Sequence, residues 1–223
     1  MALLFERVGF APQYVDYETA LQYQRKTHEK VATGQQQNTV LLLEHQEVIT
    51  AGKRTEDHEY PSDNRVPVIK IDRGGKLTWH GPGQLVGYPI VQLPEPIDVV
   101  RYVRVLEEVL IKVLTGLGIT CQQVEGRSGV WVRGDGALLP DKKIAAIGIR
   151  VSKNTTMHGF SINCNNPTDP FGAFIPCGIT DAGVTTISEQ LGRNISPADI
   201  VEQVEKELDH YANQLAASFV PAT

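Results

Sequence analysis

The sequence lacks the features that mark secreted, membrane-spanning or zinc-binding proteins. It has three cysteines in 223 residues, Cys121, Cys164 and Cys177, in unrelated contexts without a C-x-x-C pair or a neighbouring histidine cluster. Such a set favours reduced thiols over a disulfide framework, and we expect no metal site. No apolar run approaches the ~18 residues that span a membrane. The N-terminus does not resemble a signal peptide, because Glu6 interrupts a short apolar stretch. We therefore expect a cytoplasmic protein with no membrane association.

Positive charge is also scarce. With 21 Lys and Arg against 26 Asp and Glu, the formal net charge is −5. This argues against a nucleic-acid-binding protein, because that class needs a basic face. One local exception is a stretch of 23 residues with five basic side chains: Arg54, Arg65, Lys70, Arg73 and Lys76. These side chains form a candidate docking surface for an acidic protein.

Hydrophobic periodicity predicts an α+β fold. Apolar residues at helical spacing indicate helices at about 14–32 and 98–117, with Asp98 as the N-cap of the second, and Ser196-Pro197 begins a third. Strict β-α-β alternation is absent. We therefore expect a single domain over residues 1–223, with a mostly antiparallel sheet and its helices gathered on one side. The expected strands are the short β-like runs at 40–43, 66–71, 119–121, 129–133, 143–151 and 158–164.

The most informative stretch is the glycine-rich run from Arg73 to Ile90, RGGKLTWHGPGQLVGYPI. It mixes five glycines and two prolines with polar and large apolar residues. Glycine is favoured where the chain turns sharply or lies against a ligand, and a plain surface loop rarely holds so many large apolar residues. The run contains neither a P-loop pattern nor a dinucleotide-binding fingerprint placed after a strand. It indicates the lining of a pocket, with a glycine-rich hairpin in an ordinary sheet as the alternative.

Cys177 is the candidate nucleophile. It lies in a loop between Pro176 and Gly178, so little bulk surrounds its sulfur and a thioester carbonyl can approach it. From the residues alone, a small hydrophobic side chain packed beneath a loop is an equal alternative. Cys164 is expected in the core and Cys121 in a structural role.

A nucleophilic cysteine needs a neighbouring cation or base, because an unperturbed thiol has a pKa of ~8.5. Lys143 begins the apolar strand 143–150, where an amine is costly to bury unless it pairs with an anion. The alternative is a lysine that extends into solvent, as neighbouring Lys142 is expected to do. His80, inside the glycine-rich run, and His158 are the remaining polar candidates.

Three segments resemble the lipoyl(octanoyl) transferases. The glycine-rich run resembles their signature R-G-G-x-x-T-[YW]-H-G-P-G-Q-L-V-x-Y-P, with Trp79 where many members have Tyr. Residues 143–148, KIAAIG, resemble the element K-I-[AG]-[AS]-[IL]-G, and residues 176–179, PCGI, resemble P-C-G-[IYL]. The resemblance covers about residues 38–213. It implies the α+β fold that this family shares with the catalytic domains of biotin and lipoate ligases.

The resemblance also implies an activity, in which an octanoyl group moves from octanoyl–acyl carrier protein to a lysine of lipoyl domains. The implied acceptors are lipoyl domains of 2-oxoacid dehydrogenase complexes and the glycine cleavage H protein. Cys177 carries the acyl group as a thioester in this family, and Lys143 corresponds to its partner in the dyad. Proton transfer by His80 is a lesser hypothesis. The residues that the resemblance places in the acyl-binding site are Arg73, Gly74, Gly75, Lys76, Leu77, Thr78, Trp79, His80, Ala146, Ile147, Gly148, Gly159, Phe160 and Ser161.

The implied reaction uses no cofactor, metal or ATP. An ATP-dependent lipoate or biotin protein ligase on the same fold is the first alternative. Such a ligase activates a free acid as an acyl-adenylate and needs no cysteine. A carrier-protein-binding module without catalytic activity is the second. Acyl transfer from octanoyl–carrier protein to a lipoyl domain in the absence of nucleotide distinguishes the three.

Overall fold

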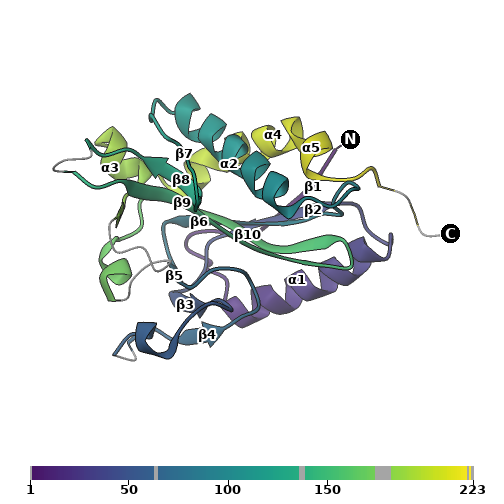
Figure 1. The fold of residues 1–223 in the computed structure, drawn as a ribbon, viewed down its shortest axis with the longest axis horizontal. Helices are drawn as coiled ribbons and strands as arrows, with labels where there is room; N and C mark the ends of the chain where they lie inside the picture. The colour runs from purple at the N-terminus through teal and green to yellow at the C-terminus, as the bar shows by residue number, and fades with distance from the viewer. Residues whose placement is uncertain (1, 63–64, 136–138, 174–181, 220, 222–223) are drawn as a thin grey trace.

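A large, mostly antiparallel sheet organises the protein, as the sequence predicts (Figure 1). The computed structural model describes residues 2–62, 65–135, 139–173, 182–219 and 221. The sheet has eight strands; β1 pairs with β2 and β11 with β9 in parallel, and the other neighbours are antiparallel. In spatial order the strands are β1 (Leu4–Gly9), β2 (Thr39–Leu43), β6 (Gln84–Ile90), β10 (Thr155–Asn163), β9 (Lys142–Ser152), β8 (Arg127–Val132) and β7 (Gln122–Val124), with β11 (Gly183–Val184) beside β9.

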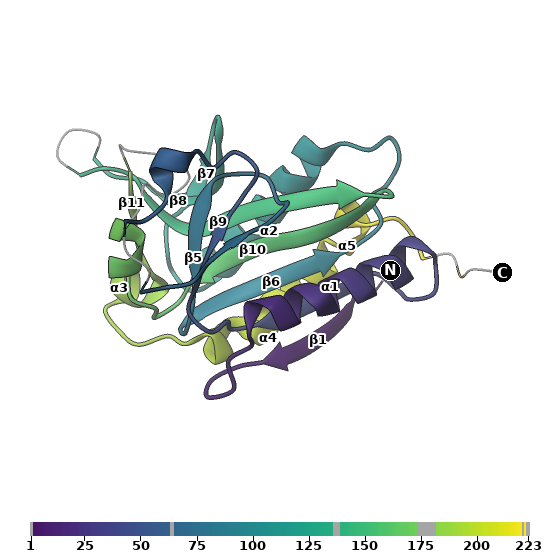
Figure 2. The same cartoon turned by 90° about the horizontal axis from the view of Figure 1, so that it is seen from below.

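A second sheet of three strands lies against one face of the large sheet, beside the long first helix (Figures 1 and 2). Its order is β4 (Val68–Lys70), β3 (Val48–Ala51) and β5 (Leu77–His80). The glycine-rich run therefore passes from one sheet to the other, and its two strands, β5 and β6, are not the arms of a hairpin. Gly83 lies in the connection between them, with a φ of +84°. A Cβ there would lie 2.6 Å from the backbone nitrogen of Asn166, so this close approach requires glycine.

Helices cover both faces of the large sheet (Figure 1). The expectation of helices on one side is wrong for α1 (Tyr17–Ala32), which packs on the face opposite α2 (Val99–Gly116), α4 (Pro197–His210) and α5 (Ala212–Leu215). The reason lies in the central strands, whose two faces are both apolar. Val40 and Leu42 of β2 face the core beneath α2, whereas Leu41 and Leu43 face α1. A sheet with two apolar faces buries both only if elements cover each side.

The predicted helix starts are confirmed for the two later helices. Asp98 caps α2 by accepting a hydrogen bond from the Arg101 backbone N–H, and Ser196 and Asp199 form a capping box at the start of α4. Helix α1 begins three residues later than predicted, because Asp16 caps it through the Thr19 backbone N–H. The three short elements that complete the fold are η1 (Asp57–Glu59), η2 (Asp169–Ala173) and α3 (Ile187–Leu191).

Two predicted strands differ in the structure. The run 66–71 contributes only Val68–Lys70, in keeping with Pro67, which has no N–H to donate to a ladder. Residues 119–121 form no strand, because this stretch completes the end of α2. Gly118 takes a φ of +92°, and the Ile119 N–H bonds the Leu114 carbonyl. The strand expected there begins at Gln122 instead.

The described residues contain no helix long and apolar enough to cross a membrane.

Candidate active site

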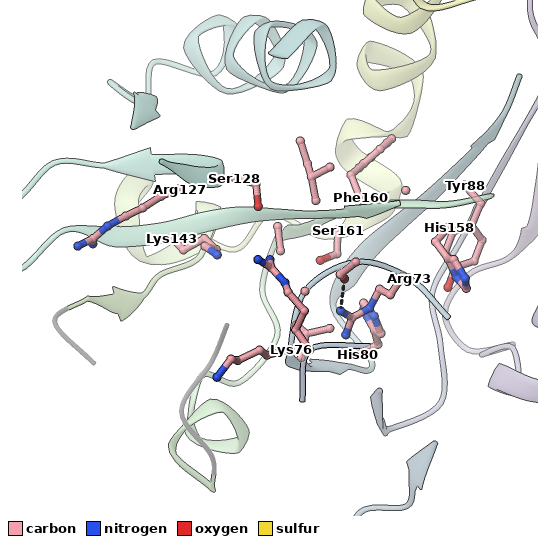
Figure 3. Close-up of a pocket in the computed structure, with 18 of the residues that line it drawn as sticks. Arg73, Lys76, His80, Tyr88, Arg127, Ser128, Lys143, His158, Phe160 and Ser161 are labelled. Atoms are coloured by element: carbon pink, nitrogen blue, oxygen red, sulfur yellow. Dashed lines mark hydrogen bonds between the residues drawn. The ribbon is translucent and has the colours of Figure 1, made fainter. Parts of the chain in front are cut away.

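A pocket of about 240 Å³ lies between the large sheet and the glycine-rich run (Figure 3). This volume is slightly below the ~300–1,000 Å³ of typical small-molecule sites. Strands β9 and β10 form the floor, the glycine-rich run with its strand β5 forms the opposite wall, and the turn before β8 and the start of β8 lie at one side. The lining residues are Tyr17, Arg54, Arg73, Gly74, Gly75, Lys76, Thr78, His80, Tyr88, Gly126, Arg127, Ser128, Lys143, Ala146, Ile147, Gly148, His158, Gly159, Phe160 and Ser161.

The floor is a tight hairpin in which two neighbouring residues take left-handed backbone conformations. Lys153 and Asn154 connect β9 to β10 with φ values of +51° and +57°, as in a two-residue type I′ turn. The resulting register places Gly148 opposite Gly159 and Ala146 opposite Ser161. Because these four side chains are small or absent, the backbone itself forms much of the floor.

The glycine-rich run lies directly on this floor. The Gly74 N–H donates to the Ile149 carbonyl of β9 at 3.0 Å. A Cβ at Gly148 would lie 3.0 Å from Cδ of Arg73. Arg73 is buried, and its guanidinium donates to the carbonyl and hydroxyl of Thr50 and to the carbonyl of Gly74. This arginine therefore joins the loop to the small sheet at the centre of the pocket.

His80 is a neutral hydrogen-bond acceptor toward the pocket. Asn163 donates its amide N–H to the Thr185 carbonyl, so its Oδ1 accepts from Gln84 Nε2. The Gln84 amide is thereby oriented, and its Oε1 accepts from His80 Nδ1 at 2.7 Å. Burial first, then the nearby His45, lowers the pKa of His80 to about 3. A base of that pKa is weak near neutrality, so the geometry favours binding over proton transfer for His80.

Aromatic side chains line one end of the pocket, and a hydrogen bond holds Tyr88 among them in place. His45 Nδ1 donates to the Val15 carbonyl at 3.0 Å, so its Nε2 accepts from the Tyr88 hydroxyl at 2.6 Å. Tyr17 stacks on His80, with ring centroids 6.4 Å apart and an interplanar angle of 8°. Burial lowers the pKa of His45 to about 4 and raises that of Tyr17 to about 12. We call Tyr17 and Tyr88 the end wall.

His158 lies at the same end in a strained backbone conformation. A regular strand would place it on the face of Phe160 and Ile162, in the core under α2. Its φ of +58° interrupts the alternation, and its Nε2–H donates instead to Asp72, which also pairs with Arg150. Burial first, and then the nearby arginines, lower its pKa to about 3. Left-handed non-glycine residues of this kind cluster at functional sites.

Lys143 lies at the opposite end from Tyr88 and His158 (Figure 3). Its Nζ is 4.7 Å from the ring centroid of Trp131, the residue paired with it on β8. A Cβ at Gly129 would lie 2.5 Å from the Ala145 carbonyl oxygen, so the close approach of β8 to β9 beside Lys143 requires glycine. Lys143 is largely buried and lines the pocket, whereas Lys142 is exposed. Of the two lysines, only Lys143 therefore belongs to the described lining of the pocket, and its role in a dyad stays a prediction.

Cys177 lies outside the described residues, within the segment 174–181. Described residues before and after that segment lie close to Lys143. Phe171 and Val184 line a small cavity together with Lys143. Beyond the segment, Val184 pairs with Lys143 in β11, and the Thr185 N–H donates to the Lys143 carbonyl at 3.1 Å.

The other two cysteines are core residues, as predicted. Cys121 and Cys164 belong to the cluster beneath α2 and α4. Burial raises the pKa of the Cys121 thiol to about 11 and that of Cys164 still further. Neither is therefore a thiolate near neutral pH. Among the described residues, no group of three or more His, Cys, Asp and Glu side chains is arranged to hold a metal ion.

The pocket brings together the predicted binding residues except Leu77 and Trp79. These two belong to the core of the small sheet with Phe171, because alternation along β5 turns them away when Thr78 and His80 face the pocket. The binding residues predicted from the sequence do not include Tyr17 or Tyr88, nor Gly126, Arg127 and Ser128 at the start of β8. Tyr88 stands inside the glycine-rich run, so that run carried a signal for it. Tyr17 reaches the pocket only through the docking of α1, which no local pattern reports.

The pocket is also strongly cationic. Arg54, Arg73, Lys76, Arg127 and Lys143 line it, and no carboxylate belongs to the described lining, in a chain of net charge −5. Lys76 pairs with Glu59 at 2.6 Å, and the Arg127 guanidinium lies 5.8 Å from the ring centroid of Trp131. A concave surface of one sign concentrates ligands of the opposite charge.

The two-sheet α+β fold is similar to solved structures of lipoate and biotin protein ligases. A crystal structure of lipoate-protein ligase A bound with ATP superposes with a TM-score of 0.73 at 14% identity, covering 99% of this chain and 88% of that one. Biotin protein ligase from Aquifex aeolicus, in complex with biotin and ATP, superposes with a TM-score of 0.54 at 16% identity, covering 96% of this chain and 70% of that one. At these identities the likeness shows the fold alone.

The sequence profile of the lipoyl protein ligase A/B catalytic domain matches residues 16–209, and the chain belongs to that family. A protein of Leifsonia xyli subsp. xyli named octanoyltransferase is 58% identical over 200 residues, covering 90% of this chain and 88% of its own. One of the same name from Pseudarthrobacter chlorophenolicus is 53% identical over 218 residues, covering 98% and 97%. These findings confirm the predicted family and fold.

Proposed function

We propose that this protein is a cytoplasmic octanoyltransferase that modifies lipoyl domains through a Cys177 thioester. The relatives named octanoyltransferase support octanoyl as the group that is transferred, and the pocket offers a site in which an acyl chain can bind. The observation that carries the proposal is the position of Lys143. Lys143 lies in the pocket on β9, the strand that pairs with β11. Strand β11 begins at Gly183, six residues after Cys177 in the sequence.

In the first half-reaction, the Cys177 thiolate attacks the thioester carbonyl of octanoyl–acyl carrier protein. The new carbon–sulfur bond forms as the bond to the pantetheine sulfur breaks. The Lys143 ammonium stabilises the attacking thiolate and then gives its proton to the departing pantetheine thiolate. The deacylated carrier protein leaves with its pantetheine thiol free, and the enzyme holds an octanoyl thioester beside a neutral lysine.

In the second half-reaction, a lysine of a lipoyl domain attacks this thioester. Its nitrogen forms the amide bond, the bond to the Cys177 sulfur breaks, and the neutral Lys143 amine takes the proton that the attacking nitrogen loses. Thiolate and ammonium are then restored. The amide is more stable than the thioester it replaces, so the balance needs neither nucleotide nor metal.

Binding is assigned to the pocket between Lys143 and the end wall. Arg73, Gly74, Gly148 and Gly159 bring backbone close to the acyl chain, and His80 presents its unprotonated Nε2 to the bound substrate. The proposed acceptors are lipoyl domains of 2-oxoacid dehydrogenase complexes and of the glycine cleavage H protein.

The test is transfer from octanoyl–acyl carrier protein to a purified lipoyl domain without added nucleotide, followed by intact-protein mass spectrometry. We expect one octanoyl group on the acceptor lysine. Transfer from free octanoate that requires ATP, with none from the carrier thioester, would establish the ligase alternative. Binding of carrier protein without either reaction would establish the non-catalytic one.

A further inference from the structure

The pocket has two chemically different ends, and an acyl chain bound in it has a defined direction. Lys143 lies at one end, and Tyr88 and His158 lie at the other (Figure 3). Lys143, Ala146 and Ser161 line one small cavity. A thioester carbonyl that reacts within reach of Lys143 therefore begins at the level of Ala146 and Ser161, and the hydrocarbon chain extends toward Tyr88.

The length of the floor can be compared with that of an acyl chain. From Ser161 to His158 the floor spans three residues of β10, or about 10 Å at the usual rise of a strand. The paired strand β9 covers the same distance from Ala146 to Ile149. An extended octanoyl chain has seven carbon–carbon bonds of about 1.5 Å, which project to about 9 Å along its zigzag axis. The methyl end of an eight-carbon chain therefore reaches the level of His158.

The end wall at that level is held rigidly. The Tyr88 hydroxyl donates to His45, which donates in turn to the Val15 carbonyl. Tyr17 contacts His45 with ring centroids 5.0 Å apart. Each of the three side chains is nearly or fully buried. To move the wall, a longer chain has to break a buried hydrogen bond, which leaves unsatisfied groups that cost about 1–3 kcal/mol.

We infer that the end wall of Tyr17 and Tyr88 sets the acyl-chain length at eight carbons. This inference rests on the proposed function and names the residues that select its substrate. A shorter chain leaves the wall uncontacted and loses apolar burial. A longer chain displaces the wall from its hydrogen-bonded position. One methylene in a hydrophobic pocket changes discrimination by ~10–200-fold.

The experiment measures kcat/KM for pantetheine thioesters with acyl chains of six, eight, ten and twelve carbons, with a lipoyl domain as acceptor. In Tyr17→Leu and Tyr88→Leu, the decanoyl-to-octanoyl ratio of kcat/KM should rise by at least about tenfold. Tyr17→Trp adds volume at the same end and should raise the hexanoyl-to-octanoyl ratio instead. Opposite shifts from opposite volume changes separate a length-selecting wall from a general loss of structure.

Tyr102→Leu is the matched control. Tyr102 is as buried as Tyr17, but it belongs to α2, packs into the core on that face of the sheet and does not line the pocket. Its substitution should leave the order of chain lengths as in the wild type. Unchanged ratios in folded Tyr17 and Tyr88 variants overturn the inference. A wild-type protein that transfers no acyl group from any thioester contradicts the proposed function instead.

A second measurement applies where the leucine variants fail to fold. Calorimetric titration of the wild-type protein with free fatty acids of six to twelve carbons should show affinity rising up to eight carbons and then falling. Affinity that keeps rising through twelve carbons overturns the inference, because the pocket then has no closed end at the level of Tyr88.

Discussion

The ammonium of Lys143 lies 4.7 Å from the ring centroid of Trp131, across the β8–β9 pair. A cation within ~6 Å of an indole ring is attracted by the electrons of its face. Trp131 is itself fully buried, so the ring is a fixed, low-dielectric surface beside the amine. The indole face therefore fixes where the Lys143 side chain ends within the pocket.

Cys177 is expected to be the acylated residue. Incubation with octanoyl–acyl carrier protein, without acceptor, should add one octanoyl mass to the peptide that contains Cys177. Cys177→Ala should abolish the adduct with the fold unchanged by circular dichroism. Cys164→Ala should keep it, because burial holds the Cys164 thiol protonated. An adduct that persists in Cys177→Ala contradicts the nucleophile assignment.

Lys143 is expected to act on both half-reactions. Lys143→Ala should slow each by ~10²–10⁴-fold, the usual contribution of general acid–base catalysis, and should raise the pH at which iodoacetamide alkylates Cys177. Lys143→Arg keeps the charge but does not shuttle a proton, so it should preserve alkylation better than turnover. The matched control is Lys142→Ala, because Lys142 is the exposed neighbour on the same strand. If Lys142→Ala slowed the reaction and Lys143→Ala did not, the assignment of the role to Lys143 would be wrong.

Arg54 is expected to contribute to the docking of an acidic carrier protein. Its side chain is exposed at the pocket, where long-range attraction is screened within ~8 Å at physiological salt. Arg54→Glu should raise the KM for octanoyl–carrier protein, and the KM of the wild type should rise with ionic strength. Transfer from octanoyl-pantetheine should change little by comparison.

Lys53→Glu supplies the control for this charge reversal. Lys53 is the exposed neighbour of Arg54 and lies outside the pocket lining, so the KM should respond less to its reversal. Equal effects at both positions would show that docking depends on net charge. A KM independent of salt would show that docking depends on apolar contact.

The buried histidines are expected to make stability depend on pH. The pKa of His45 is about 4 in the folded protein, because burial disfavours the charged ring, against ~6.5 in an unfolded chain. The unfolded state therefore binds more protons below pH ~6.5. The stability contribution of neutral His45 is complete above that value and is lost as the pH falls toward 4. The expected slope is about 1.4 kcal/mol per pH unit for each such histidine.

Urea unfolding at several pH values between 7.5 and 5 measures this slope. His45→Asn should reduce the slope by about one proton's contribution, even if it lowers stability at every pH by removing the bond to Tyr88. His58→Asn, at an exposed position, should leave the slope unchanged. An identical slope in His45→Asn and wild type would show that His45 is not held neutral.

The sequence alone was sufficient for the features that depend on local chemistry. Asp98 and the Ser196–Asp199 box mark helix starts because capping uses residues adjacent in the chain. The motif around Arg73–His80 indicated one pocket wall. The family resemblance of KIAAIG, and not the residues alone, selected Lys143 over Lys142, and its catalytic role stays a prediction. The α+β class followed from the order of apolar runs, which is also a property of neighbouring residues.

Only the tertiary structure decided what joins distant segments. Alternation along β5 places Leu77 and Trp79 on the face opposite Thr78 and His80. Which of these faces lines the pocket depends on β5 lying in a separate sheet from β6, and the sequence does not show that. Tyr17 closes the pocket because α1 covers the second apolar face of the large sheet, and the periodicity of the helix does not report which face that is. The left-handed backbone of His158 likewise depends on Asp72, 86 residues away along the chain. Local propensity specifies elements, whereas the burial of two apolar faces at once determines where those elements meet.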